Sequence, residues 1–125
     1  MGSRLGTLAI LAVMVMQSPA EADKADHNAN YFLPGCRDFA NKEFGKAPFL
    51  AGECVGVLEG LSLLARDLTP GFEIISSCVP ENATLGQMAT VVLRWLDQHP
   101  ARWHEDFRSL ALLSLHDAWP CPTSK

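Results

Sequence analysis

The hydrophobic residues between positions 34 and 119 recur every three or four residues, and this spacing predicts amphipathic helices. The first helix is expected to begin at Pro34, because proline suits the first turn of a helix, and to end at Gly45. The second is expected to run from Phe49 to about Arg66. Its broad apolar face comprises Leu50, Cys54, Val57, Leu58, Leu61, Leu64 and Ala65.

The third and fourth helices are marked by a start signal and by two prolines. Thr84 and Gln87 have the spacing of a capping box, in which each side chain hydrogen-bonds the backbone N–H of the other. Pro100 is expected to end the third helix and begin the fourth, which Pro120 stops. No strand-like alternation persists, so we expect an all-α domain of four helices. The fourth helix is expected to turn inward Trp103, Phe107, Leu110, Ala111, Ser114 and Ala118, and to carry a second, uncovered apolar edge of Leu112, Leu115 and Trp119.

Three glycines, Gly52, Gly56 and Gly60, lie four residues apart on the second helix. Each interior glycine costs a helix about 1 kcal/mol relative to alanine, so three in register call for an explanation. Missing side chains let a second backbone approach closely. The stripe therefore predicts either close packing inside one chain or the interface of a homodimer.

The first 22 residues have the three parts of a secretory signal peptide. Arg4 supplies a basic start, residues 5–16 form an uncharged apolar run, and Ala20 and Ala22 are the small residues that a signal peptidase reads. The run is too short to cross a bilayer as a helix, which takes about 20 residues. We therefore expect cleavage after Ala22, a single domain over residues 23–125 and a periplasmic location; a buried N-terminal helix is the alternative.

The charged residues of the chain argue against two classes of partner, nucleic acids and membranes. The net charge is −4, and it is unchanged by cleavage because the signal peptide carries one arginine and one glutamate. A weakly acidic chain without a basic cluster is not expected to bind nucleic acid. Glu53, Glu59 and Arg66 interrupt the second most apolar stretch, so no membrane association is expected after cleavage.

All four cysteines, Cys36, Cys54, Cys78 and Cys121, follow the signal peptide. An even number in a small exported domain indicates two disulfides, with three connectivities open. Their spacings of 18, 24 and 43 residues include no Cys-x-x-Cys pair, which argues against a metal site. If the helices form two antiparallel hairpins, turning near residues 45–48 and at Pro100, the expected pairs are Cys36–Cys54 and Cys78–Cys121. The fold predicted is thus two disulfide-stapled helical hairpins.

The stretch from Arg102 to Phe107 holds a histidine, two carboxylates and two aromatic residues, as an active site might. A metalloprotease helix, however, needs two histidines four residues apart, and His104 has no such partner. Carboxylates in the first turns of a helix also complement its dipole. A nucleophilic cysteine would need a free thiolate, whereas every cysteine here is expected to form a disulfide. We therefore expect no catalytic residue, no metal ligand and no cofactor.

Several segments together resemble a known family. These are "ANYFLPGCRDF", "FLAGECVGVLEGL", "CVPENATLGQMATVVLRWLDQHPARWHEDF" and "LHDAWPC", in that order. They are similar to the Tai-type immunity proteins of type VI secretion amidase effectors, and the resemblance covers about residues 28–121. It implies a small periplasmic helical protein, often dimeric, that binds and blocks a peptidoglycan-cleaving amidase and has no catalytic activity of its own.

The segment from Asp67 to Ser77 is our candidate for the contact with that amidase. It is part of a break of 16 residues in the helical pattern, and loops of this length are often functional. Its aromatic residue, Phe72, is of the kind that interfaces favour. The alternative is an ordinary loop that packs Phe72, Ile74 and Ile75 into the core. The candidate partner-binding residues are Asp67, Leu68, Thr69, Pro70, Phe72 and Glu73.

Two other functions compete with the immunity protein. One is an acid-stress chaperone of the periplasm similar to HdeA-like proteins, which are also small, helical and disulfide-bonded. The other is a periplasmic binding protein without a cognate toxin. Two disulfides, three tryptophans and only four histidines favour a core that stays closed at low pH. A small enzyme has no support from any group of residues.

Overall fold

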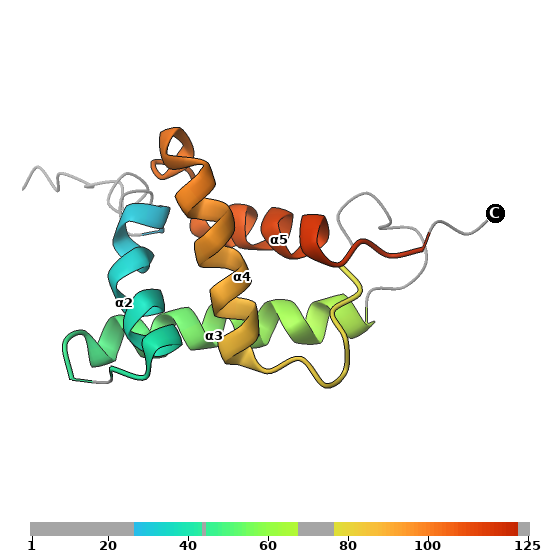
Figure 1. Ribbon diagram of the computed structural model, residues 1–125, viewed down its shortest axis with the longest axis horizontal. Helices are drawn as coiled ribbons and strands as arrows, with labels where there is room; N and C mark the ends of the chain where they lie inside the picture. The colour runs from blue at the N-terminus through green and yellow to red at the C-terminus, as the bar shows by residue number, and fades with distance from the viewer. Residues whose placement is uncertain (1–26, 44, 68–76, 123–125) are drawn as a thin grey trace, which may run out of the picture.

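A computed structural model describes residues 27–43, 45–67 and 77–122 (Figure 1). These residues form four α-helices and no β-strand, which confirms the predicted all-α class. The signal peptide predicted over residues 1–22 lies outside the described residues. The elements are α2 (Ala29–Asn41), α3 (Pro48–Asp67), α4 (Leu85–Gln98), one 3-10 turn η1 (Pro100–Arg102) and α5 (Phe107–Ala118).

The helices cross one another. In Figure 1, α2 and α4 stand upright, and α3 and α5 lie across them. The short connections still pair α2 with α3 and α4 with α5, but the two helices of a pair cross where we expected them to lie antiparallel. Gly35 makes the first crossing close: a Cβ at this position would lie 2.2 Å from the carbonyl carbon of Leu50. Only glycine permits this contact between the backbones of α2 and α3.

Both predicted disulfides are present. Cys36 and Cys54 join α2 to α3 beside this crossing, with their Cα atoms 5.3 Å apart. Cys78 and Cys121 join the segment before α4 to the segment after α5, at a Cα separation of 4.8 Å. A backbone hydrogen bond of 2.8 Å from Cys78 N–H to Trp119 O reinforces the second link. The predicted pairing is thus confirmed, although the hairpins are crossed.

The core lies where the four helices meet. Phe32 of α2 stacks on Phe107 of α5, with ring centroids 4.4 Å apart. Two buried polar side chains are hydrogen-bonded: Ser114 donates to Ala111 O at 2.7 Å, and Asp38 accepts from Ala47 N–H at 2.6 Å. The apolar core comprises Ala29, Phe32, Leu33, Cys36, Cys54, Leu58, Met88, Ala89, Val92, Trp95, Leu96, Phe107, Leu110, Ala111 and Leu115.

Three helix boundaries differ from those predicted. α2 ends at Asn41, where Lys42 caps it, and does not extend to Gly45. α2 begins at Ala29, because Asn28 caps it by accepting from Tyr31 N–H at 3.0 Å, and Pro34 lies inside the helix. α5 begins at Phe107, since Pro100 starts only the 3-10 turn. The start of α4 is as predicted: the capping box of Thr84 and Gln87 has both of its hydrogen bonds.

Three residues differ from our expectation in whether they are buried or exposed. Leu64 is 56% exposed in the last turn of α3. Leu115 is fully buried because α5 contacts both α3 and α4, so the second apolar edge of α5 is largely covered. Ala118, expected inside, is exposed in the last turn of α5.

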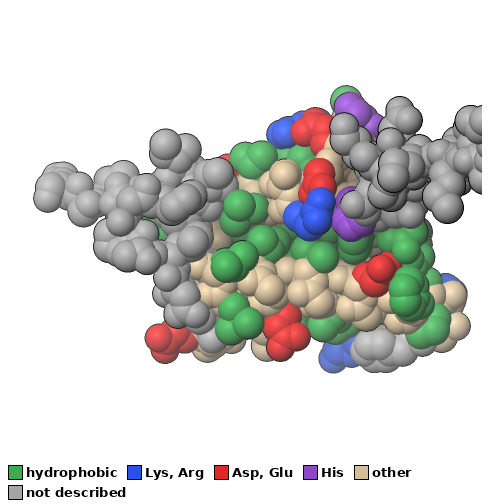
Figure 2. Space-filling view, turned by 180° about the vertical axis from the view of Figure 1, so that it is seen from behind, with side chains coloured by type: hydrophobic (Ala, Val, Ile, Leu, Met, Phe, Trp, Pro, Cys, Tyr) green, Lys and Arg blue, Asp and Glu red, His purple; other side chains and the backbone are tan. Residues whose placement is uncertain are grey.

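The glycine stripe faces outward. A Cβ placed on Gly52, Gly56 or Gly60 would have nothing within 4 Å. Close packing of these glycines inside one chain is therefore wrong for the described residues. The same helix exposes Phe49 and Leu63, by 72% and 55%. Figure 2, which views the molecule from behind, shows hydrophobic and uncharged atoms over much of this side.

Candidate functional site

The stretch from Arg102 to Phe107 is a joint between two helix N-termini. The first four N–H groups of a helix have no partner within the helix and must find one elsewhere. In α2, the N–H of Ala29 donates to Glu105 O and that of Asn30 to Trp103 O, both at 3.1 Å. The next two amides, of Tyr31 and Phe32, donate to Asn28.

The start of α5 is completed in the same way from the other side. Phe107 N–H donates to His27 O at 2.7 Å, and the Asp106 side chain accepts from the N–H groups of Arg108 and Ser109. Leu110 N–H donates to Asp106 O at 3.1 Å. The four leading amides of each helix are thereby satisfied. The stretch is accounted for by its role in the fold.

The carboxylates of this joint are held ionised by arginine partners. Arg102 donates two hydrogen bonds of 2.7 Å to Glu105, and these lower the pKa of the Glu105 carboxyl below its ordinary value. The pKa of Asp106 is lowered chiefly by the hydrogen bond from the Arg108 side chain, assisted by two backbone N–H groups and opposed by partial burial. A catalytic acid would need a raised pKa, so this arrangement suits structural carboxylates.

No group of three or more histidine, cysteine or carboxylate side chains within residues 27–43, 45–67 and 77–122 could hold a metal ion. All four cysteines are disulfide-bonded. His104 is exposed at the surface of the joint. None of the described helices is long and apolar enough to span a membrane.

Of the predicted partner-binding residues, only Asp67 belongs to the described structure. Asp67 is the last residue of α3, and Ser77, which is buried, pairs with Pro120 in an isolated β-bridge. The residues between them lie outside the described part of the chain. Leu68, Thr69, Pro70, Phe72 and Glu73 therefore stay a prediction.

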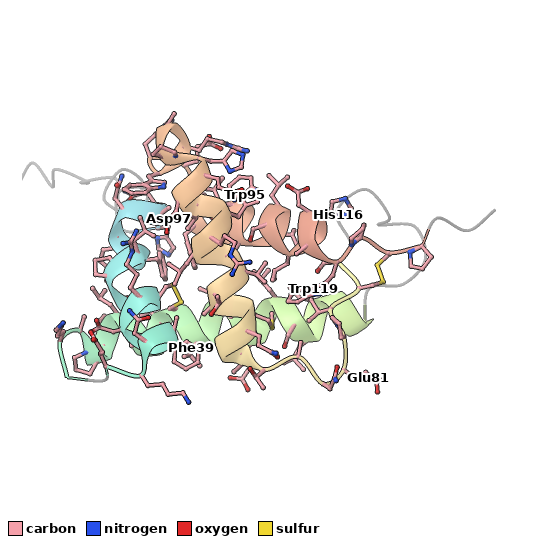
Figure 3. The ribbon with its side chains drawn as sticks, in the orientation of Figure 1. Phe39, Glu81, Trp95, Asp97, His116 and Trp119 are labelled. Carbon is pink, nitrogen blue, oxygen red and sulfur yellow. A yellow bond between two sulfur atoms is a disulfide. The ribbon has the colours of Figure 1, made fainter. Side chains whose placement is uncertain are left out.

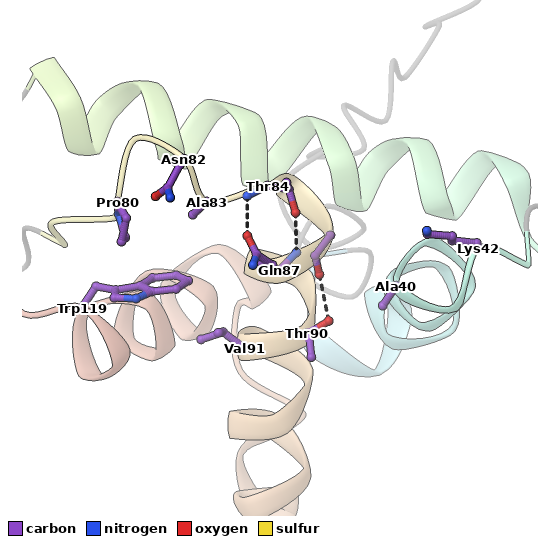
Figure 4. Close-up of a pocket in the computed structure, with 11 residues that line it drawn as sticks. Ala40, Lys42, Pro80, Asn82, Ala83, Thr84, Gln87, Thr90, Val91 and Trp119 are labelled. Carbon is purple, nitrogen blue, oxygen red and sulfur yellow. Dashed lines mark hydrogen bonds between the residues drawn. The ribbon is translucent and has the colours of Figure 1, made fainter.

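The described residues also form a groove that sequence reasoning did not find (Figure 4). It has a volume of about 580 Å³ and lies between the end of α2, the segment before α4 and the first turns of α4. We call it the α2–α4 groove. Its lining residues are Ala40, Lys42, Pro80, Asn82, Ala83, Thr84, Gly86, Gln87, Thr90, Val91 and Trp119.

The groove has well-defined walls. Thr84 and Gln87 are locked together by the capping box, and Thr90 Oγ1 donates to Gly86 O at 2.8 Å. Figure 4 shows Trp119 at one end and Lys42 at the other. Lys42 has a φ of 60°, and its N–H caps α2 by donating to Asp38 O and Phe39 O. The sequence did not mark this position as the end of a helix, because the left-handed residue there is usually a glycine and here is a lysine.

Polar contacts surround the C-terminal end of α4. Trp95 donates from Nε1 to Asp117 at 2.8 Å and stacks on His99, and Asp97 forms an ion pair with Arg37 at 2.7 Å. Figure 3 labels Trp95 and Asp97, both of which belong to α4. These contacts link α4 to α5 through Asp117 and to α2 through Arg37.

Comparison with known proteins gives one match. A family model described as Rap1a immunity proteins matches residues 28–121, which include all the described helices. No significant match was found among curated proteins or among solved structures. The immunity family expected from the sequence is confirmed, whereas the narrower Tai-type assignment stays a prediction.

Proposed function

Because the chain belongs to the Rap1a immunity protein family, an immunity family of type VI secretion effectors, we propose that it protects its own cell by binding one such effector in the periplasm. The observation that carries the proposal is the family match over residues 28–121. Immunity proteins are generally non-catalytic. The side chains and carbonyl groups of residues 102–107 cap helices, which is consistent with a protein that acts by binding.

The periplasmic location rests on two features. Residues 1–22 have the pattern of a signal peptide, and the mature part contains two disulfides. Disulfides form and persist in oxidising compartments such as the periplasm, and they are rare in the cytosol. Two disulfide bonds therefore support export of the chain.

The effector that we propose is an amidase that cleaves peptidoglycan, as the Tai-type resemblance implies. Such an enzyme acts in the periplasm, where an exported immunity protein meets it. The chain would bind the amidase and block its action on the cell wall. The segment from Asp67 to Ser77 is proposed to take part in this contact.

Protection of cells tests the proposal. A peptidoglycan amidase encoded beside this gene is directed to the periplasm of a host, together with this protein either complete or lacking residues 1–22. We expect growth with the complete chain and lysis without the signal peptide. Lysis in both cases would reject the proposed function.

Phe72→Ala tests the contact segment. Loss of an aromatic anchor at an interface costs about 2 kcal/mol or more, which corresponds to a fall in affinity of about thirtyfold. Calorimetric titration of the amidase measures the change, with circular dichroism as the control for folding. An unchanged dissociation constant in a folded variant would remove this segment from the interface.

We also propose that the outer face of α3 pairs with a second copy of the chain. A Cβ on its glycines would meet no atom of the described residues, and Phe49 and Leu63 beside them are exposed. Sedimentation velocity should detect a dimer of the wild type, and Gly56→Glu should shift it toward monomer. Ser109→Glu, at an exposed position of α5, is the control. A monomeric wild type at high concentration would contradict the dimer.

A further inference from the structure

The lysine and arginine side chains of the described residues form ion pairs, with two exceptions. Four of the described basic side chains form ion pairs: Arg37, Lys46, Arg102 and Arg108. Within the described part of the chain, Lys42 and Arg94 form no ion pair and are both exposed. Charge left over after this pairing is available to a partner.

Both unpaired cations line hollows that adjoin. Lys42 lines the α2–α4 groove. Arg94 lines a second hollow of about 390 Å³, which shares Ala40 and Thr90 with the groove and therefore continues it along α4.

The carboxylates near these cations do not neutralise them. None of the residues that line the groove is acidic. The second hollow contains one carboxylate, Asp97, whose oxygen already accepts from Arg37 at 2.7 Å. The part of this surface that carries Lys42 and Arg94 is thus basic in a chain whose net charge is −4, whereas the exposed Glu81 lies between the lining residues Pro80 and Asn82. Such a site attracts an anionic group and sets the orientation in which it arrives.

The walls of the groove are formed before any partner binds. The capping box fixes its middle, and the Cys78–Cys121 disulfide ties the segment before α4 to the chain beyond Trp119. Little conformational freedom is then lost on binding, which favours affinity. Trp119 is half-buried at the far end from Lys42 and can receive an apolar side chain (Figure 4).

We propose that the α2–α4 groove and its continuation bind a carboxylate-bearing loop of the effector, with Lys42 and Arg94 contacting the carboxylates. This inference rests on the proposed function, because the loop belongs to the effector. Trp119 would contact an apolar side chain of the same loop. The proposed contact is non-covalent.

Charge reversal tests the inference. Binding of the purified product of the effector gene encoded beside this one is measured with Arg94→Glu and with Lys42→Glu/Arg94→Glu. We expect the double variant to bind about tenfold more weakly or worse, mainly through slower association. Association of the wild type should slow between about 50 and about 300 mM NaCl, and that of the double variant should respond less.

Two matched controls separate the groove from general effects. Lys46→Glu makes the same charge change on the turn between α2 and α3, outside the groove, and should leave affinity unchanged. Thr90→Phe fills the groove, whereas Ser109→Phe adds the same ring at an exposed site on α5. Circular dichroism checks folding, and Arg94→Glu alone, in an exposed position within α4, covers the case in which Lys42→Glu disturbs the end of α2.

The outcomes distinguish the two proposals. Weaker binding by the double variant and by Thr90→Phe, with both controls unchanged, supports the groove as the docking site. Wild-type affinity in Arg94→Glu, in the double variant and in Thr90→Phe overturns the groove and leaves the proposed function standing. Absence of binding by the wild type overturns both.

Discussion

Gly35 and Gly56 are both helical glycines, yet an added methyl group would meet opposite surroundings at the two positions. At Gly35 it would collide with the backbone of Leu50, whereas at Gly56 no atom of the described part of the chain lies within 4 Å. The sequence drew attention to the regular stripe that includes Gly56. The close approach is at the isolated Gly35, which no pattern marked.

The same substitution should therefore change stability in opposite directions. Gly35→Ala is expected to lower the free energy of unfolding by about 1–3 kcal/mol, because α2 and α3 must separate. Gly56→Ala should raise it by up to about 1 kcal/mol through helix propensity. Urea unfolding at low protein concentration measures both. A Gly35→Ala variant as stable as the wild type would contradict the crossing.

Asp106 has two roles at the joint, as the N-cap of α5 and as the ion-pair partner of Arg108. Its pKa is lowered in the folded chain, mainly by the Arg108 side chain. The stability that this ionised carboxyl contributes is present above the unfolded-state pKa of about 4 and is lost as the pH falls through the folded-state pKa.

Asp106→Asn separates the charge from the cap. Asparagine caps a helix about as well as aspartate but does not titrate. We expect the wild type to lose stability between about pH 4 and pH 2 more steeply than the variant, with a difference under about 1 kcal/mol because the pair is partly exposed. Asp106→Ala should cost about 1 kcal/mol at neutral pH as well. Urea midpoints across this range provide the test, and parallel curves for wild type and Asn variant would exclude the linkage.

At the scale of the helices, local signals predicted what local interactions determine. The capping box at Thr84 and the stop at Pro120 were correct, because neighbouring residues supply the hydrogen bonds or remove them. The start of α2 was missed because Ala29 and Asn30 donate to carbonyls more than 70 residues away. Asn28 was a visible capping residue, but the proline at position 34 drew the predicted start toward itself.

The two disulfides provide a prediction about helix packing. By loop entropy alone, Cys78–Cys121, with a separation of 43 residues, should stabilise the fold by about 4 kcal/mol, and Cys36–Cys54, with 18, by about 3 kcal/mol. Burial reverses this order. Cys36 and Cys54 are fully buried, so their removal also leaves a cavity worth about 2 kcal/mol.

We therefore expect Cys36→Ala/Cys54→Ala to be less stable than Cys78→Ala/Cys121→Ala by about 1 kcal/mol. Guanidinium unfolding of the two double variants measures the difference. The second pair is the natural control, since Cys78 is exposed and Cys121 half-buried. The reverse order would show that chain entropy outweighs packing at the α2–α3 crossing.

At the scale of the whole molecule, the sequence predicted the class, the number of helices and the disulfides, but not the candidate site. The α2–α4 groove brings together residues from positions 40 to 119, and its basic character depends on which cations lack an ion pair. Pairings such as Arg37–Asp97 exist only once α2 and α4 are packed. No one-dimensional pattern records them.

The protein that we propose is an exported, disulfide-linked inhibitor that binds a cell-wall amidase. The measurement that tests it most directly is a titration of amidase turnover on purified peptidoglycan, using residues 23–125 with both disulfides formed and the amidase encoded beside this gene. We predict a linear fall in activity to an endpoint near equimolar inhibitor. Full turnover at a large molar excess of this protein would contradict the account.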